Sequence, residues 1–124
     1  MRASRRLSVS AHGAIESLCG MAIMLSPLVL GVGAAGLVVL GAIGAIVTGT
    51  GLGLISTAPR AGALPSRRDS VRAHTGLDGL LVVASALGAL GLALAGEAPA
   101  ALALTALVAV QAALSFTTSY ATAS

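Results

Sequence analysis

The sequence predicts an all-α membrane protein, a four-transmembrane-helix bundle built from two parallel helical-hairpin repeats. Of its 124 residues, 56% are hydrophobic and only 9% are charged, and the mean hydropathy is +1.00. A soluble domain carries about 25% charged residues, and a disordered chain combines low hydrophobicity with high net charge. Two long stretches, residues 17–59 and 79–96, contain no Asp, Glu, Lys, Arg or His. These observations exclude a water-soluble domain and a disordered chain.

The lengths of the uncharged stretches predict where the helices lie. A bilayer core of about 30 Å is crossed by roughly 20 residues of helix, so the first stretch holds two spans and a tight turn. We expect spans at residues 12–30, 34–56, 75–95 and 100–119. The corresponding segments are a basic N-terminal arm at 1–11, a first transmembrane hairpin at 12–56, an Arg-rich loop at 57–74, a second transmembrane hairpin at 75–119 and a C-terminal tail at 120–124.

The distribution of positive charge predicts the orientation. Four spans place both termini and the central loop on one side of the membrane, and all basic residues fall there. The positive-inside rule then predicts a multi-pass protein of the cell membrane with cytoplasmic N- and C-termini. No nucleic-acid partner is expected, because a basic face with stacking aromatics is missing from the sequence. The expected partner is the lipid bilayer, with a homo-oligomer or a partner membrane protein as further alternatives. The basic residues are Arg2, Arg5, Arg6, Arg60, Arg67, Arg68 and Arg72.

The two halves of the chain share a short pattern. Residues 12–18 and 74–80 each read His, three residues, an acid, a small residue and Leu. Each copy opens a span that leaves the Arg-rich side. Because both copies start on the same side, the halves are predicted to be parallel repeats rather than inverted ones.

One hairpin carries a family resemblance. Ser26-Pro27-Leu28, at the outer end of the first span, resembles the Ser-Pro-Trp motif of the SPW-repeat bacterial membrane proteins. Glu16 and Gly20 also fit that family's pattern of an opening acid followed by Gly, whereas Leu28 replaces the signature Trp. The second half matches only through its opening acid. The resemblance implies a small bacterial membrane protein with this topology and implies no reaction.

The rare ionisable residues are the first candidates for a site. His12 and Glu16, and likewise His74 and Asp78, are spaced to share one face of a helix. Two such pairs brought together could handle ions or protons, or bind a divalent metal. The interpretation that the sequence favours is structural: acids in a first helical turn cap free N–H groups and complement the helix dipole. On that interpretation we expect no metal ion and no cofactor.

Two further polar features lie within the spans. Pro27 is expected to free the carbonyl of Ile23 and bend the first span, with Ser26 available to satisfy the freed group. A broken helix lining a substrate site is the functional alternative to this bend. Gln111 falls near the middle of the fourth span, so it should hydrogen-bond to another helix. A place in a polar pathway is the alternative for Gln111.

Small residues recur at every fourth position in two of the spans. Such rows let helices approach closely in lipid, so they are predicted to be packing surfaces. The row in the second span is Gly41, Ala45, Gly49 and Gly53, and the row in the fourth span includes Ala101, Thr105, Ala109 and Ala113.

These features favour a small structural or accessory membrane protein. The alternative is a small proton-coupled transporter or ion-handling subunit that uses Glu16 and Asp78. An enzyme is not expected, because a nucleophile with an adjacent base is missing from the sequence, and no catalytic residue is assigned.

Overall fold

The computed structural model describes residues 6–56 and 66–118, with the side chains of the second range described from residue 73 onward. Four helices in these ranges are long and apolar enough to cross a membrane. The prediction of an all-α four-helix bundle is therefore confirmed. The helices are α1 (Val9–Leu25), continued by the short α2 (Pro27–Leu30), then α3 (Ala34–Ser56), α4 (Ser66–Leu94) and α5 (Ala98–Thr117).

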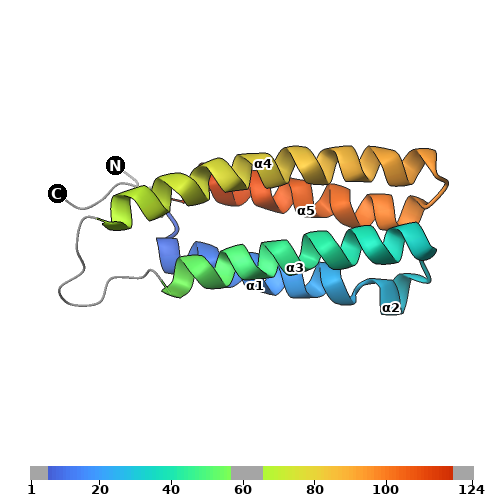
Figure 1. The fold of residues 1–124 in the computed structure, drawn as a ribbon, viewed down its shortest axis with the longest axis horizontal. Coiled ribbons are helices and arrows are strands. Elements are labelled where there is room, and N and C mark those ends of the chain that lie inside the picture. The colour runs from blue at the N-terminus through green and yellow to red at the C-terminus, as the bar shows by residue number, and fades with distance from the viewer. Residues whose placement is uncertain (1–5, 57–65, 119–124) are drawn as a thin grey trace.

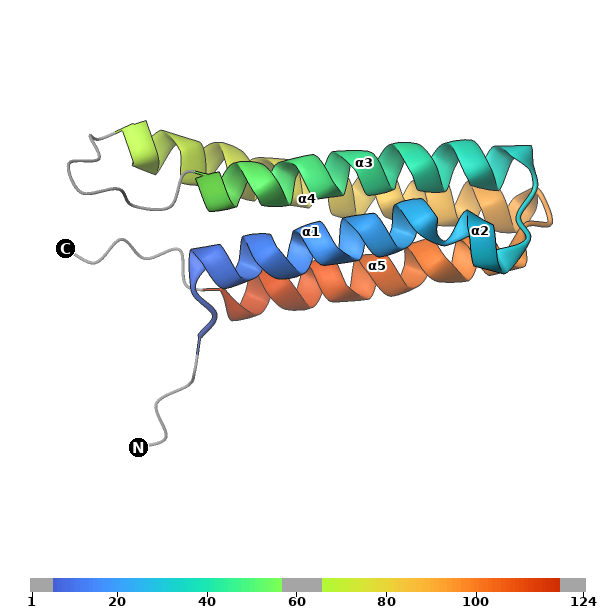
Figure 2. The same cartoon turned by 90° about the horizontal axis from the view of Figure 1, so that it is seen from below.

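The long helices lie side by side as two hairpins (Figure 1). One hairpin consists of α1, α2 and α3, and the other of α4 and α5. Turned by 90°, the bundle shows α3 next to α4 and α1 next to α5 (Figure 2). The apolar core lies between the hairpins and includes Leu40, Val47, Leu81, Leu92 and Leu104.

Glycines allow α1 and α3 to pack at close range. A Cβ atom added at Gly13 would lie 2.7 Å from the carbonyl oxygen of Gly51, and one added at Gly44 would lie 2.6 Å from the backbone nitrogen of Met24. Real Cβ atoms do not approach backbone so closely, so only glycine fits at these contacts. Close backbone approach is how helices associate where lipid offers no hydrophobic driving force.

The contacts in α3 do not follow the row predicted from the sequence. A Cβ atom added at Gly41, Gly49 or Gly53 would meet nothing within 4 Å, and Ala45 is exposed. The prediction that this row packs against another helix of the chain is wrong. Four residues turn an α-helix by more than a full circle, so a strict every-fourth row drifts around it. The buried row combines steps of four and three residues: Gly36, Leu40, Gly44, Val47, Gly51 and Leu54.

The same correction applies to α5. Ala101 is buried as expected, whereas Thr105, Ala109 and Ala113 are exposed. The residues of α5 that pack inward are mostly larger: Ala100, Ala101, Leu104, Leu107, Gln111 and Leu114.

The first span breaks where the sequence predicts. Helix α1 ends at Leu25, and α2 begins at Pro27 in a new direction (Figure 1). Pro27 has no N–H to donate to the Ile23 carbonyl oxygen. The hydroxyl of Ser26 donates to that oxygen instead, at 2.7 Å, so the carbonyl has a hydrogen-bond partner. Gly31 then turns the chain in the left-handed region, with φ of 61°.

Helix α4 starts earlier than the sequence suggested. It begins at Ser66, so residues 66–74 are helical, and the prediction that the whole of 57–74 is a loop is wrong for this part. Pro65 is the last helix breaker before the span, and the arginines and alanine that follow are good helix formers. The part of this helix that is long and apolar enough to cross a membrane is Ala73–Leu94.

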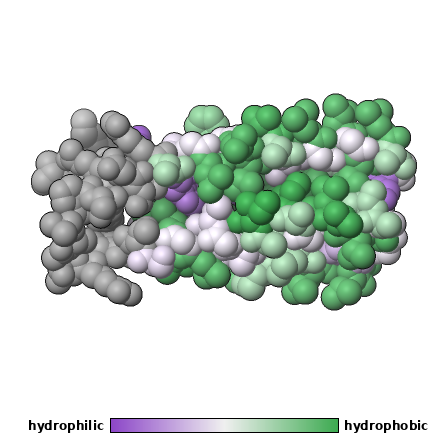
Figure 3. Space-filling model, viewed as in Figure 1, coloured by the Kyte–Doolittle hydropathy of each residue, from purple (hydrophilic) through white to green (hydrophobic). Residues whose placement is uncertain are grey.

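The face of the bundle seen in Figure 3 is largely apolar over the described residues. Large hydrophobic side chains face outward, such as Val29 at 86%, Leu94 at 81% and Phe116 at 87% exposure. A protein in water does not leave a band of this size uncovered. The fold is compatible with a small integral membrane protein in a lipid bilayer.

A carboxylate joins the two hairpins at the end that holds α2. Glu97, in the turn between α4 and α5, accepts a hydrogen bond from the backbone N–H of Gly36 at 2.9 Å. This contact serves one of the free N–H groups in the first turn of α3. The hairpins are therefore tied together by a polar contact at this end as well as by the apolar core.

Candidate functional site

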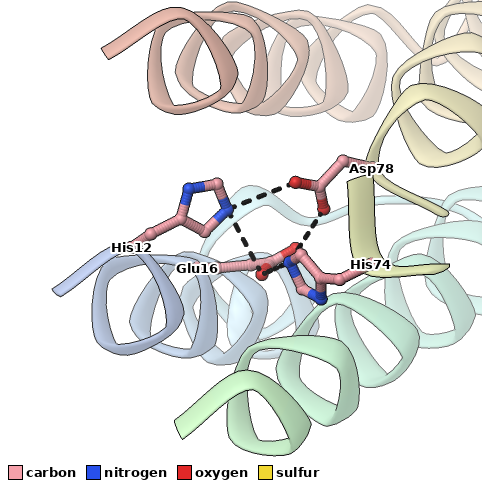
Figure 4. A group of neighbouring side chains, drawn as sticks. All are labelled: His12, Glu16, His74 and Asp78. Carbon is pink, nitrogen blue, oxygen red and sulfur yellow. Dashed lines mark ion pairs between the residues drawn. The ribbon is translucent and has the colours of Figure 1, made fainter. Parts of the chain in front are cut away.

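Four ionisable side chains converge at the other end of the bundle (Figure 4). His12 and Glu16 extend from α1, and His74 and Asp78 extend from α4. Their exposed fractions are 0%, 0%, 7% and 2%, respectively. The sequence repeat therefore brings its two His–acid pairs into one buried cluster between the hairpins.

Each histidine lies next to both carboxylates. His12 Nε2 is 3.3 Å from Asp78 Oδ2 and 3.7 Å from Glu16 Oε2. His74 Nε2 is 3.2 Å from Glu16 Oε2 and 3.2 Å from Asp78 Oδ1. Two of these four contacts, His12–Asp78 and His74–Glu16, join the hairpins, and each pairs the histidine of one repeat with the acid of the other. One ligand atom from each of the four residues lies within 4.8 Å of the other three.

The capping interpretation of the acids is wrong. The N-cap of α1 is Ser8, whose hydroxyl accepts from the backbone N–H of Ala11 at 3.2 Å, and the first turn of α1 holds no acid. Asp78 lies well inside α4, because that helix begins at Ser66. Neither acid is near free backbone N–H groups, so both carboxylates need another source of stabilisation.

Side chains from the remaining helices hold Glu16 in place. The Oε1 atom of Glu16 accepts from the Gln111 amide of α5 at 3.3 Å. It also lies 3.1 Å from the Thr50 hydroxyl of α3, whose single proton is shared with the Val47 carbonyl oxygen at 2.9 Å. The prediction that Gln111 bonds to another helix is confirmed. Oε1 faces these two groups, and Oε2 faces the histidines.

His12 is held through its other ring nitrogen. Its Nδ1 lies 2.7 Å from the hydroxyl oxygen of Thr118, the residue that ends α5. The two imidazole rings meet edge to face, with centroids 5.5 Å apart. Every long helix of the bundle thus contributes to the cluster or to the groups that support it.

Positive charge at the centre of the cluster would stabilise its two carboxylates. Carboxylates that stay ionised in a low-dielectric interior are costly unless a cation compensates them. Two protons on the imidazoles or one divalent cation would supply that charge. His74 Nε2 and Glu16 Oε2 lie 3.2 Å apart, yet neither has a partner in hydrogen-bond geometry among the described residues. The spacing thus leaves a place for a cation that contacts both atoms.

The remaining predicted features lie elsewhere. Ser26 and Pro27 are at the α2 end and make their bend there, away from the cluster. Nothing in the sequence indicates the supporting role of Thr118, and Thr50 is one of several span hydroxyls that can bond to their own helix. A pattern of polar residues at the loop-side ends of the spans is the only sign that could have drawn attention to them.

Comparison with known proteins adds no relative. No protein-family model matches the chain, no curated protein matches it, and no solved structure matches it.

Proposed function

We propose that the protein is a small integral membrane protein that binds one divalent metal cation between its two hairpins. The observation that carries this proposal is the convergence of two imidazole nitrogens and two carboxylate oxygens, each hairpin supplying one of each. The proposal departs from the expectation of no metal, which depended on the acids being helix caps. It specifies the ion-handling alternative drawn from Glu16 and Asp78.

The spacing of the four atoms supports a small tetrahedral ion. Metal bonds of about 2.0–2.1 Å to nitrogen and oxygen place the ligand atoms of a tetrahedral site roughly 3.3 Å apart. The four nitrogen-to-oxygen distances of the cluster, which include both Asp78 oxygens, are 3.2, 3.2, 3.3 and 3.7 Å. One ligand atom from each residue lies within 4.8 Å of the other three, so the four side chains would have to move inward to close on such an ion.

The donor set supports a particular class of metal. Imidazole and carboxylate together suit Zn²⁺ and neighbouring first-row ions, whereas Ca²⁺ and Mg²⁺ prefer six or more oxygens. Copper(I) prefers thiolate or thioether ligands, and Cys19 is not part of the cluster. We therefore propose Zn²⁺, Co²⁺, Fe²⁺ or Mn²⁺ as the class of cation.

Titration of the purified protein in detergent with Co²⁺ tests the proposal. Tetrahedral Co²⁺ absorbs strongly in the visible range, so we expect visible bands that saturate at one ion per chain and disappear when Zn²⁺ is added. Mg²⁺ should not displace the ion.

Two variants and a matched control locate the binding. Glu16→Gln keeps the shape of the side chain and removes its charge, and His74→Gln removes a ring nitrogen; each should abolish the bands. Glu97→Gln changes a glutamate at the opposite end of the bundle and should bind like the parent. No binding by the parent protein, or binding by Glu16→Gln equal to that of the parent, would rule out the metal site.

Proton relay is the second candidate function. It is favoured by the exchanged pairs His12–Asp78 and His74–Glu16, which lie at 3.3 and 3.2 Å. In liposomes, a proton flux that Glu16→Gln and Asp78→Asn both abolish would support it. Absence of any flux in the parent protein would exclude it.

The distribution of charge and the Ser-Pro motif support two further proposals. We propose that both termini are cytoplasmic, supported by the position of all basic residues on one side of four spans. We also propose kinship with the SPW-repeat membrane proteins, supported by Ser26, Pro27 and the opening Glu16. A structural or accessory role, with a second copy or a partner membrane protein, is compatible with a bound cation that ties the hairpins together.

A further inference from the structure

We propose that Thr118 is a positioning residue of this site: its hydroxyl holds the His12 ring with a proton on Nδ1 and thereby directs Nε2 to the cation. This inference rests on the proposed cation site and adds a residue that lies outside the ligand set. It follows from the direction of two hydrogen bonds at the end of α5.

The first step concerns the proton of the Thr118 hydroxyl. The hydroxyl oxygen lies 2.7 Å from the carbonyl oxygen of Leu114. Two oxygens at this distance need a proton between them, and a carbonyl has none to give. The hydroxyl therefore donates its only proton to Leu114.

The second step concerns the His12 ring. Its Nδ1 lies 2.7 Å from the same hydroxyl oxygen. Because the hydroxyl proton is already used, Thr118 can only accept here, and Nδ1 must carry the hydrogen. A ring that carries a single proton then has its lone pair on Nε2.

The third step concerns where that lone pair lies. Nε2 is the ring atom beside Asp78 and Glu16, at 3.3 and 3.7 Å from their carboxylate oxygens. A nitrogen lone pair beside two carboxylates is unfavourable unless a metal cation or a second ring proton lies between them, and the proposed site supplies the cation. Hydrogen-bonding a metal-ligating histidine through its other nitrogen is the usual way in which proteins fix the ligand atom.

The Thr118 side chain is itself firmly placed. The residue is 5% exposed, and its backbone N–H donates to the Leu114 carbonyl at 3.0 Å. An isolated bridge pairs it with Leu7, whose N–H donates to the Thr117 carbonyl oxygen at 3.0 Å. The segment that precedes α1 thus fixes the backbone at the end of α5, from which the Thr118 hydroxyl extends.

Thr117 provides a natural contrast. Its exposed hydroxyl donates to the Ala113 carbonyl oxygen at 2.7 Å, within its own helix, and has no contact with the histidines among the described residues. Thr117→Val is therefore a matched control for Thr118→Val, because both substitutions replace a hydroxyl by a methyl at adjacent positions.

The test combines cation affinity with nitrogen NMR of the rings. Protein labelled with ¹⁵N in its two histidines is recorded ion-free and with Zn²⁺, and the His12 signals are assigned from the spectrum of His74→Gln. We expect a proton on Nδ1 of His12 in the parent protein, in Thr118→Ser and in Thr117→Val. Thr118→Val should lose this preference and bind Co²⁺ about 10- to 100-fold more weakly, as is typical when the partner of a ligating histidine is removed.

The outcomes separate this inference from the proposed function. A parent protein whose His12 carries its only proton on Nε2 would overturn the role of Thr118, even if Thr118→Val failed to fold. Unchanged Co²⁺ affinity in folded Thr118→Val would also overturn it. A parent that binds no cation but keeps its Nδ1 proton only with Thr or Ser at position 118 would exclude the metal site and retain the positioning of the ring.

Discussion

Gln111 shows how one polar side chain is accommodated within an apolar span. An amide facing lipid would be costly, and the structure places this one inside the bundle at 1% exposure. Its Nε2 donates to Glu16 Oε1, so the amide connects α5 to α1 and restrains the orientation of the carboxylate. The contact therefore holds a carboxylate of the cluster in place and also joins two helices.

Replacing Gln111 by Leu should weaken cation binding more than it weakens the fold. Loss of the donor frees the Glu16 carboxylate to rotate, and we expect the Co²⁺ affinity to fall about 10-fold. The free energy of unfolding in mixed detergent should change by about 1 kcal/mol or less, because an apolar side chain fills the same space.

Thr105→Val is the control for this prediction. The Thr105 hydroxyl bonds the Ala101 carbonyl oxygen of its own helix at 2.8 Å, so its loss should leave the Co²⁺ affinity unchanged. Equal losses in the two variants would mean that Gln111 acts on the whole helix rather than on Glu16.

Acid should weaken the binding of the cation. Imidazole nitrogens and carboxylates bind metal only in their deprotonated forms, so protons compete with the ion for the same four atoms. The apparent dissociation constant for Co²⁺ should therefore rise as the pH falls and never decrease. Titrations at a series of pH values in one non-coordinating buffer measure this, and a pH-independent constant would contradict binding at the cluster.

Among the elements, α3 carries two kinds of glycine that differ in what they contact. A Cβ atom at Gly51 would lie 2.6 Å from the Gly13 carbonyl oxygen and 2.7 Å from the Ser17 backbone nitrogen. A Cβ atom at Gly49 would meet nothing within 4 Å. Gly51 is thus needed for the close packing of α1 and α3, and Gly49 is not.

Gly51→Ala should force α1 and α3 apart and destabilise the protein. Overpacking of this kind typically lowers the free energy of unfolding by about 1–3 kcal/mol. Gly49→Ala should cause no loss, because the new methyl group faces outward. Unfolding of both variants in mixed detergent micelles compares them directly, and equal destabilisation would argue against a glycine-mediated contact between α1 and α3.

The sequence predicts the spans of these helices well and their contacts poorly. Span length is set by the bilayer, and residues 34–56 were assigned correctly for that reason. The row that contains Gly41 and Gly49 was assigned to the wrong face, because small residues are so frequent that several rows of them run along each helix. The start of α4 at Ser66 was missed because arginines suggest a loop even where their helix propensity is high.

At the scale of the whole molecule, the orientation can be tested with single cysteines. In a Cys19→Ser background, Ser66→Cys and Ala98→Cys lie at opposite ends of the α4–α5 hairpin. A membrane-impermeant thiol reagent should label them from opposite sides of the membrane, with position 66 on the cytoplasmic side. Labelling of both positions from one side would contradict the four-span arrangement.

The sequence repeat predicts that the two His–acid pairs lie close together, but it does not predict that they are buried or which side chains support them. The repeat, starting twice on the same side, implied that residues 12–16 and 74–78 lie at the same level of the bundle. Burial of His12 and Glu16 at 0% exposure depends on how the hairpins are packed, which the repeat does not specify. Thr118, which holds the His12 ring, lies near the other end of the sequence, and no spacing of residues around His12 predicts this contact.

The histidine of each repeat lies next to the acid of the other repeat. This arrangement has a consequence for the evolution of the chain and for its division into two fragments. Each hairpin alone offers one imidazole and one carboxylate, which is half of a coordination sphere. Two separate copies of a single hairpin, related by a twofold axis along the membrane normal, would complete the same sphere between them. Splitting the chain within residues 57–65 and co-expressing the halves should therefore yield fragments that the ion reunites.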